Sequence, residues 1–437
     1  MFFPTSHSQT PIWECPIFCE TQFHLILSLP NRSLARRGML KTALLFFFLI
    51  CGFYLPASAQ DTTEIKSGKN KGLVITAGDS SYSIKLNMAL QPRITASANL
   101  SDNDFVQGKV LIRRARLIFS GFAVSTDLEY FFQLGLSNQD MESSGDPAND
   151  YPGIIFDALI KWTFAPGTRL WFGQGKLPGA KTRLFSYQGL NFLERSTAEN
   201  KFNVYRDAGL WLHNTLNIGD AVLNTSAAIT GGEGKNRFTA GGGYCYTGRI
   251  EYLPLGSFKS GGDNYLPDLT RESSLKLAAG AAYSFNDDAV RTRGTLGSSL
   301  YSHRDIETAM GDILIKYGGL SIFAEYYKRL CSNPLTFSIE NPENKRYVYK
   351  GQGYSAEASY MITPKINFAL RCSFTEPHND IEELTPYIED YSLGFTRFFN
   401  QNHVKLQADI TYTTEKFARH GSQSEFLAFG INMILQI

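Results

Sequence analysis

The chain has 437 residues and a formal net charge of +1, with 42 basic residues against 41 acidic ones. Such an even balance names no partner, so any charge preference must come from where the charged residues lie, and we expect no nucleic-acid partner. Six cysteines are present, with no CxxC pair: Cys15, Cys19, Cys51, Cys245, Cys331 and Cys372. Cys15, Cys19 and Cys51 lie in the N-terminal segment that the export signal described next would remove, which leaves an odd number, three. This number and the lack of a CxxC pair predict neither a disulfide framework nor a structural zinc site, and we expect no cofactor.

The N-terminal part carries an export signal. The stretch MLKTALLFFFLICGFYLPASAQ, Met39 to Gln60, combines Lys41, an apolar run and the small residues Ala57 and Ala59, as a secretory signal peptide does. Its apolar run is too short for a transmembrane helix, which needs about 20 residues. We therefore expect cleavage after Ala59 or Gln60.

This signal divides the chain into four parts. Residues 39–59 are the predicted signal peptide, and residues 1–38 before it are either an upstream mis-start or a disordered extension. After cleavage, residues 60–81 would form a short periplasmic segment. Residues 82–437 would form the one folded domain.

A period of two dominates this domain. In TDLEYFFQLGLS, Leu128, Tyr130 and Phe132 alternate with Glu129 and Gln133. The same alternation places Leu406 and Ile410 opposite Lys405, Gln407 and Asp409 in HVKLQADITYT, and it returns at 82–98, 156–164, 320–327, 354–362 and 366–374. Successive side chains of a strand point to opposite faces, so the chain is predicted to be all-β.

Two architectures use this pattern: a soluble β-sandwich or barrel, and a transmembrane barrel with an apolar outer face and a wet lumen. Aromatic residues lie near the strand ends on the apolar faces, as in interfacial girdles: Trp162, Phe164, Tyr326, Tyr360 and Tyr412. Connections also alternate in length. Short turns occur at 124–127, 165–168, 218–220, 318–319, 363–364 and 400–402, and longer polar loops at about 137–152, 176–204, 286–310, 330–352, 376–390 and 414–424.

Short turns on one rim and long loops on the other are typical of an outer-membrane barrel. Following the alternation from Tyr82 to Ile437 predicts about 16 antiparallel strands with both ends on the short-turn side. Residues 254–273 must then be a long periplasmic connection. The alternative is 18 strands, with GLVITAGDSSYSIKL forming an additional N-terminal hairpin. Either barrel leaves a water-filled channel.

The strand KVLIRRARLIFSGF, Lys109 to Phe122, carries three arginines. Alternation places Arg114 and Arg116 in the lumen and Arg113 toward lipid, where an arginine costs about 2–4 kcal/mol near the midplane. Either a β-bulge turns Arg113 inward, or Arg113 lies close enough to the rim to reach water. Charges of both signs share the lumen face elsewhere: Lys85, Arg93, Lys161, Arg371 and Lys405, with Glu129, Asp157, Glu325, Glu357 and Asp409.

Several motifs resemble the phosphate-selective porin O and P family of Gram-negative outer membranes. They are IRRARLIFSGF, DLEYFFQLGLSNQD, FGQGKLPGAKTRL, RDAGLWLH and YSFNDDAVRTRG, and they span most of the domain. The resemblance implies a homotrimer of 16-stranded barrels in contact with outer-membrane lipid. It also implies inward-folded loops that narrow each lumen, with arginines and lysines at the narrow part.

The resemblance further implies where anions bind. The family's paired strand arginines match Arg113 and Arg114, next to Arg116, and its inward loop arginines match Arg291 and Arg293. The constriction loop matches Lys176 to Tyr205, so Lys176, Lys181 and Arg183 are further candidates. Guanidinium groups offer a planar fork of donors to phosphate oxygens. The expected cargo is a small anion, phosphate or polyphosphate.

Other functions remain open at this point. A general, unselective diffusion porin would show the same mixed wall, and a structural barrel would conduct nothing. A rim enzyme is disfavoured, because the histidines of the domain are scattered without a catalytic spacing: His213, His303, His378, His403 and His420. The main prediction is an anion-preferring porin that is not an enzyme.

Overall fold

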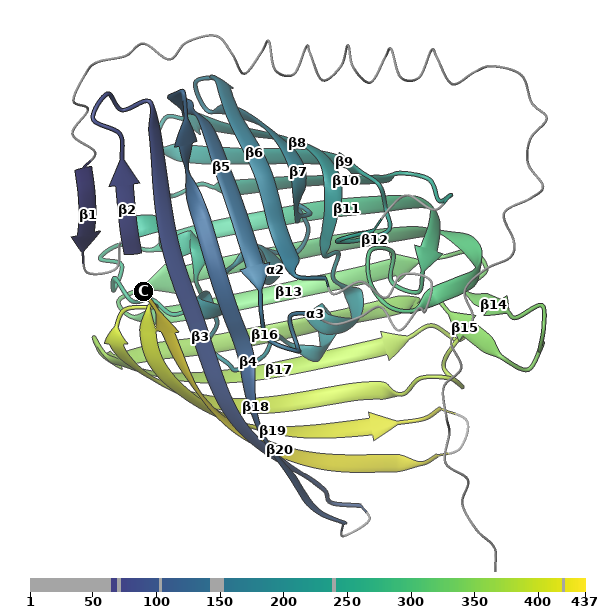
Figure 1. Ribbon diagram of the computed structural model, residues 1–437. Coiled ribbons are helices and arrows are strands. Elements are labelled where there is room, and N and C mark those ends of the chain that lie inside the picture. Colours follow the sequence, from purple (N-terminus) through teal and green to yellow (C-terminus); the bar gives the residue numbers. More distant parts are fainter. Residues whose placement is uncertain (1–63, 69–71, 102–103, 142–152, 238–240, 419–420) are drawn as a thin grey trace, which may run out of the picture. The chain divides into compact units, whose positions relative to one another are not determined.

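Figure 1 shows a computed structural model of the chain, which describes residues 64–68, 72–101, 104–141, 153–237, 241–418 and 421–437. The expected N-terminal extension, 1–38, and the signal peptide, 39–59, lie outside the described residues. No helix in the described ranges is long and apolar enough to cross a membrane.

Sixteen antiparallel strands among the described residues close into a barrel, which confirms the predicted fold and strand number (Figure 1). Each strand pairs with the next, and the last returns to the first, residues 426–436 against 99–89. The strands are β3 (Tyr82–Asn99), β4 (Asp104–Ala123), β5 (Ser125–Gly135), β6 (Ile155–Ala165), β7 (Thr168–Lys176), β8 (Arg206–Ile218), β9 (Ala221–Thr230), β10 (Cys245–Leu253), β11 (Lys276–Arg291), β12 (Ser299–Tyr317), β13 (Leu320–Leu330), β16 (Gly351–Thr363), β17 (Ile366–Pro377), β18 (Tyr387–Asn400), β19 (Val404–Lys416) and β20 (Gln423–Gln436).

Two short strands precede the barrel. β1 (Glu64–Gly68) pairs with β2 (Gly72–Thr76), and β2 pairs with residues 83–86 at the start of β3. The hairpin of the 18-strand alternative therefore exists, but β2 has only five residues, whereas a spanning strand needs about 9–11. It extends the sheet at the rim and does not enlarge the barrel.

Side chains alternate across the barrel wall as the sequence predicts. The outward positions expose apolar and aromatic groups such as Ile160, Trp162 and Phe172, while Lys405 and Gln407 on the inner face are fully covered. With no water in the hydrocarbon region, an apolar outer belt is the arrangement that a bilayer stabilises. The barrel therefore has a lipid-compatible exterior and a polar interior.

The rims confirm the predicted alternation of turns and loops. All six predicted short turns join strands at one rim, and the connection after β10, residues 254–275 with η3 (Lys259–Asn264), lies at that same rim as expected. The loop predicted at 286–310 is much shorter, 292–298, because β11 and β12 continue through a bulged register. The loop after β13 carries a small hairpin of β14 (Leu335–Phe337) and β15 (Lys345–Tyr347).

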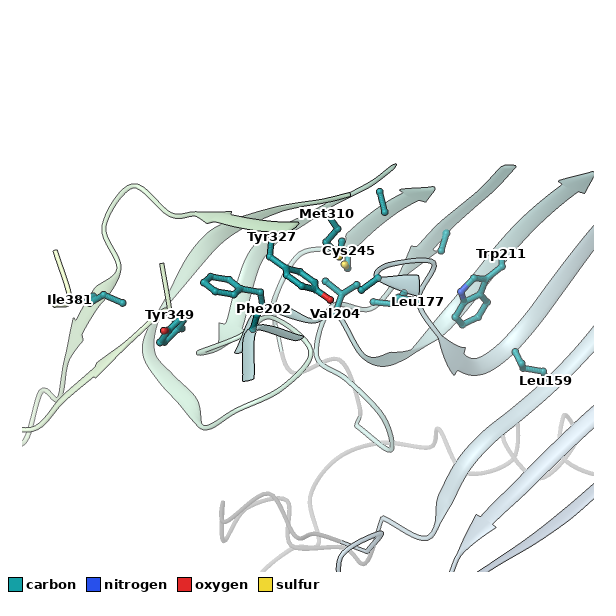
Figure 2. Close-up of a cluster of buried hydrophobic side chains, with 14 residues drawn as sticks. Leu159, Leu177, Phe202, Val204, Trp211, Cys245, Met310, Tyr327, Tyr349 and Ile381 are labelled. Atoms are coloured by element: carbon teal, nitrogen blue, oxygen red, sulfur yellow. The ribbon is translucent and has the colours of Figure 1, made fainter. Parts of the chain in front are cut away.

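The loop between β7 and β8, residues 177–205, folds into the barrel (Figure 1) and contains α2 (Lys181–Leu184), η2 (Tyr187–Gly189) and α3 (Thr197–Phe202). The side chain of Ser196 caps α3 by accepting from the Glu199 amide, 3.1 Å away. Figure 2 shows Phe202 from α3 against Tyr327 and Tyr349, in a buried cluster that continues to Leu177 and Trp211. This apolar seam attaches the loop to the wall.

Inward glycines make room for this loop. A Cβ on Gly394 of β18 would lie 2.9 Å from the Phe192 ring, and one on Gly430 of β20 would lie 2.6 Å from a methyl group of Leu193. Both distances are shorter than carbon atoms tolerate, so a larger residue at either position would push the loop away from the wall. Glycine is therefore needed here for close approach.

The 254–275 connection also enters the lumen and meets the loop from the other side. The Leu266 amide donates to the Gly189 carbonyl at 2.7 Å, and Phe258 and Leu266 belong to one buried cluster with Phe185 and Leu190. The Lys316 ammonium holds the connection by donating to the carbonyls of Gly262, Tyr265 and Pro267. Loop and connection together leave only part of the lumen open.

The alternation predicts a sharp difference between neighbouring positions of β4. Ser120 lines the interior, while Phe119 lies on the outer face with Phe132 as its cross-strand partner. With Cys245, Cys331 and Cys372 replaced by alanine, a membrane-impermeant thiol reagent should label S120C in reconstituted barrels and leave F119C unlabelled. Labelling of F119C without S120C would show that the register of β4 is wrong.

The attachment of the 254–275 connection inside the lumen can be tested by changing Lys316, which holds it. Lys316→Met keeps the aliphatic stem and removes three charged hydrogen bonds, each of which contributes about 1.5–3 kcal/mol. Trypsin should then cleave after the exposed Lys259 several times faster, and single-channel conductance should rise. Lys276→Met is the matched control, because Lys276 makes one exposed bond to the carbonyl of Leu255 in the same connection. Equal cleavage rates in both variants would contradict the anchoring role.

Candidate functional site

A β-bulge in β4 sets the direction of the three strand arginines. Gln91 of β3 pairs with Arg114, but the next residue, Pro92, pairs with Ile112, so Arg113 is the extra residue of the bulge. Proline has no amide hydrogen to donate to the ladder, which makes its position a natural place for a bulge. The extra residue turns Arg113 inward beside Arg114, so the bulge alternative is correct and the rim alternative is wrong.

The carboxylate of Glu194, in loop 177–205, lies among three guanidiniums. Arg113 Nε donates to Glu194 Oε1 at 2.7 Å, Arg93 NH1 donates to the same oxygen, and Arg114 NH2 lies 3.7 Å from Oε2. Burial opposes ionisation of this carboxyl, but the charges of the arginines outweigh it and hold the pKa of Glu194 below its ordinary value. The side chain is nevertheless 40% exposed, toward the interior cavity.

Two bidentate ion pairs continue the arginine row along the wall. Arg116 donates to both oxygens of Asp140 at 2.8 Å, and Arg206 donates to both oxygens of Asp157 at 2.9 and 3.0 Å. Both guanidiniums contact the ring of Phe156, whose centroid is 4.4 Å from Arg116 Cζ and 4.8 Å from Arg206 Cζ. Paired oxygens and an aromatic face hold the guanidinium planes in fixed orientations.

Other cations are held by backbone carbonyls. Lys176 donates to the carbonyls of Leu184 and Phe185 at 2.9 Å, at the C-terminal end of α2. Arg195 donates to the carbonyls of Thr182 at 2.9 Å and Phe185 at 3.1 Å. The hydrogen bonds to backbone carbonyls orient these two side chains without pairing them with a carboxylate.

The predicted pair at the end of β11 lies close to the same loop. Arg291 is the last residue of β11 and donates to the carbonyls of Glu233, Thr295 and Gly297. Arg293, in the 292–298 turn, donates to the carbonyl of Asn200 in α3. These bonds tie three loops together at the top of the cavity.

These residues enclose one cavity of about 1030 Å³ between loop 177–205 and the wall formed by β3 to β9. Thirteen basic residues line it against three acidic ones, a formal excess of ten positive charges. The basic residues are Lys85, Arg113, Arg114, Arg116, Lys161, Lys176, Arg183, Arg195, Arg206, Lys235, Arg237, Arg291 and Arg293; the acidic ones are Asp140, Asp157 and Glu194.

Seven of the eight residues predicted for a constriction line this cavity, and Lys181 does not. The Lys181 side chain points the other way, is almost fully buried, and forms an ion pair with Glu251 of β10. The sequence could not show this, because Lys181 and Arg183 belong to a helix of four residues, where positions two apart face different sides.

Four basic residues that line the cavity were not predicted from the sequence: Arg195, Arg206, Lys235 and Arg237. Arg206 opens the RDAGLWLH motif, which could have marked it as a strand-end arginine. Arg195 lies within the constriction loop itself, next to Glu194. Lys235 and Arg237 come from the β9–β10 loop, for which the sequence offers no signal beyond their charge.

The predicted acidic residues of the wall lie mostly under the loop. Glu325 accepts from the hydroxyl and amide of Thr182, and Asp409 accepts from the Leu193 amide at 2.8 Å. Glu357 accepts from the Asn191 side chain at 3.2 Å. None of these three carboxylates lines the cavity. The loop therefore covers these carboxylates, together with cations such as Lys405 and Arg329 that donate to loop carbonyls, and the wall that stays open to the cavity is mostly basic.

No group of three His, Cys, Asp or Glu side chains within the described residues could hold a metal ion. Solved structures of similar fold include an anion-selective porin from Comamonas acidovorans, with 11% identity over 81% of this chain and all of that chain, at a TM-score of 0.51. OprB of Pseudomonas putida shares 9% identity over 81% of this chain and 94% of its own, with the same TM-score.

The outer membrane channel DcaP of Acinetobacter baumannii matches with 10% identity over 82% of this chain and 98% of that chain, at a TM-score of 0.50. No curated protein sequence matches the chain. The family model of phosphate-selective porin O and P matches residues 88–371. Because this match covers more than half of its length, the chain belongs to the phosphate-selective porin O and P family and is a β-barrel channel of the outer membrane.

Proposed function

We propose that the protein is an anion-preferring porin for phosphate or related small anions, and that the cavity behind loop 177–205 is its selective passage. One observation carries this proposal: thirteen basic side chains against three acidic ones in a cavity that the loop narrows. A narrow passage with low-dielectric walls focuses the field of nearby charges, so this local excess outweighs a total charge near zero.

The residues proposed to bind the anion are Arg113, Arg114, Arg116, Arg291, Arg293, Lys176 and Arg183, joined by Arg195 and Arg206. Guanidinium keeps its charge at any relevant pH and matches phosphate oxygens with two parallel donors. An ion that loses part of its hydration shell in the passage can exchange water for these donors. Because the donors form a series of sites, each exchange leads to the next and none has to hold the ion firmly.

The covered carboxylates support the preference for anions over cations. A cation would need acceptor oxygens along its path, and Glu325, Glu357 and Asp409 accept from loop groups and are closed off by the loop. Of the acidic residues in the cavity, Asp140 and Asp157 each share both oxygens with an arginine. A permeating cation therefore finds few oxygens to replace its water.

Export through a cleaved signal peptide at residues 39–59, assembly as a homotrimer and lipid contact along the aromatic outer belt belong to the same proposal. The outer face supports lipid contact through exposed aromatic groups at Trp162, Phe164 and Tyr326. No enzymatic activity is proposed. A general diffusion porin is the alternative, and the following experiments distinguish it by ion selectivity.

Removing two cavity arginines tests the anion preference. The double variant Arg114→Ala/Arg293→Ala removes two positive charges from the cavity lining. In planar bilayers with asymmetric KCl, the reversal potential should move toward zero, and inorganic phosphate should block chloride current less strongly. Arg397→Ala is the matched control, because Arg397 is exposed and lies outside the cavity lining. An unchanged reversal potential in the double variant would favour the unselective porin.

Charge and guanidinium geometry can be separated. The double variant Arg113→Lys/Arg114→Lys keeps both positive charges but replaces each planar guanidinium with an ammonium group. The preference of the channel for anions over cations should therefore persist in reversal-potential measurements. The phosphate concentration that halves the chloride current should rise roughly tenfold, the effect of losing about one charged hydrogen bond. Equal block by phosphate in this variant and the wild type would show that charge alone accounts for recognition.

A further inference from the structure

Arg113 and Arg114, the two arginines at the β4 bulge, already face an anion in this structure, and this anion is the carboxylate of Glu194. Glu194 Oε1 accepts from both Arg93 and Arg113, and Oε2 faces Arg114. The three guanidiniums around these two oxygens form a donor set of the kind that an oxyanion such as phosphate would require. Because Arg113 and Arg114 line the cavity and the Glu194 side chain is 40% exposed toward it, an entering anion can reach these two donors.

The backbone at Glu194 is fixed more firmly than its side chain. Arg371 donates to the Glu194 carbonyl at 2.9 Å, Arg93 donates to the Leu193 carbonyl at 2.8 Å, and the Leu193 amide donates to Asp409 at 2.8 Å. These bonds do not involve the Glu194 carboxylate. The side chain can therefore leave its arginines by rotation about its own bonds while the loop stays in place.

We propose that Glu194 is a tethered counter-anion that competes with the permeating oxyanion for Arg113 and Arg114, and so speeds its release. This proposal deepens the proposed function and rests on it. In the empty pore the carboxylate occupies the donors and keeps them oriented. When an oxyanion enters, the carboxylate is displaced but remains within a side-chain length, where its negative charge repels the ion.

The physical need for such a competitor follows from the charge of the site. Arg113 and Arg114 in the cavity, with the positive charge of Arg93 close by, would bind a divalent oxyanion tightly, and a channel conducts only if the ion also leaves. Like charges a few ångströms apart repel strongly where the effective dielectric constant is low. A carboxylate that cannot diffuse away supplies this repulsion in every passage of an ion.

Glu194→Gln tests the proposal, because glutamine keeps the size and the hydrogen-bonding oxygen of glutamate and removes its charge. With the purified protein in planar bilayers, the inorganic phosphate concentration that halves the chloride current should fall roughly tenfold. The current carried by phosphate at saturating concentration should fall as well, since release slows. Glu194→Asp keeps the charge on the same backbone and should behave like the wild type in both measurements.

Asp409→Asn is the control for the loop. Asp409 holds the adjacent Leu193 amide but does not line the cavity, so loosening of the loop would affect D409N and E194Q alike. A purely structural role of Glu194 predicts weaker phosphate block and higher conductance in E194Q, the opposite of the effect expected here. Either that result or an unchanged block overturns the proposal.

Measurements on wild-type channels distinguish a failure of this inference from a failure of the proposed function. If wild-type channels show anion preference and phosphate block but E194Q does not bind phosphate more tightly, only the role of Glu194 is refuted. If wild-type channels show neither anion preference nor phosphate block, the proposed function fails, and the role of Glu194 fails with it.

Discussion

The properties of the cavity depend on one constraint: carboxylates inside a barrel must be paired or hydrated, because burying an unpaired charge costs several kcal/mol. The constriction loop meets this requirement for the acidic part of the wall. Its Thr182, Asn191 and Leu193 donate to Glu325, Glu357 and Asp409 in turn. The same contacts that stabilise the loop remove negative charge from the passage, so a nearly neutral protein encloses a strongly positive cavity.

Selectivity and stability are linked through this arrangement. The loop lies on one side of the lumen because its partners lie there: the acidic residues, the inward glycines and the aromatic groups around Phe202. The open space that remains faces β3 to β9, where the arginines are. The connection 254–275 supports the loop from the opposite rim through Leu266 and Gly189. A change that detached the loop would widen the passage and expose its carboxylates together.

The arginines are held in three ways with different consequences. Carboxylates pair bidentately with Arg116 and Arg206, aromatic faces orient their planes, and backbone carbonyls hold Arg195, and likewise Lys176, without a paired carboxylate. Glu194 stands apart because one carboxylate serves three guanidiniums and remains accessible. A graded series of this kind suits a channel, in which an ion has to be attracted at each step and bound firmly at none.

The sequence by itself determined the barrel, about sixteen strands with eighteen as the alternative, the short-turn rim, and the face of most strand residues, since alternation and turn chemistry are local properties. It also limited Arg113 to two alternatives, and the bulge opposite Pro92 decided between them. Which charges remain open to the lumen was decided only by the tertiary structure. The contact between Leu193 and Asp409 spans 216 residues, and the side to which Lys181 turns depends on Glu251 in another strand. Such pairings arise from where the loop packs, which no local pattern encodes.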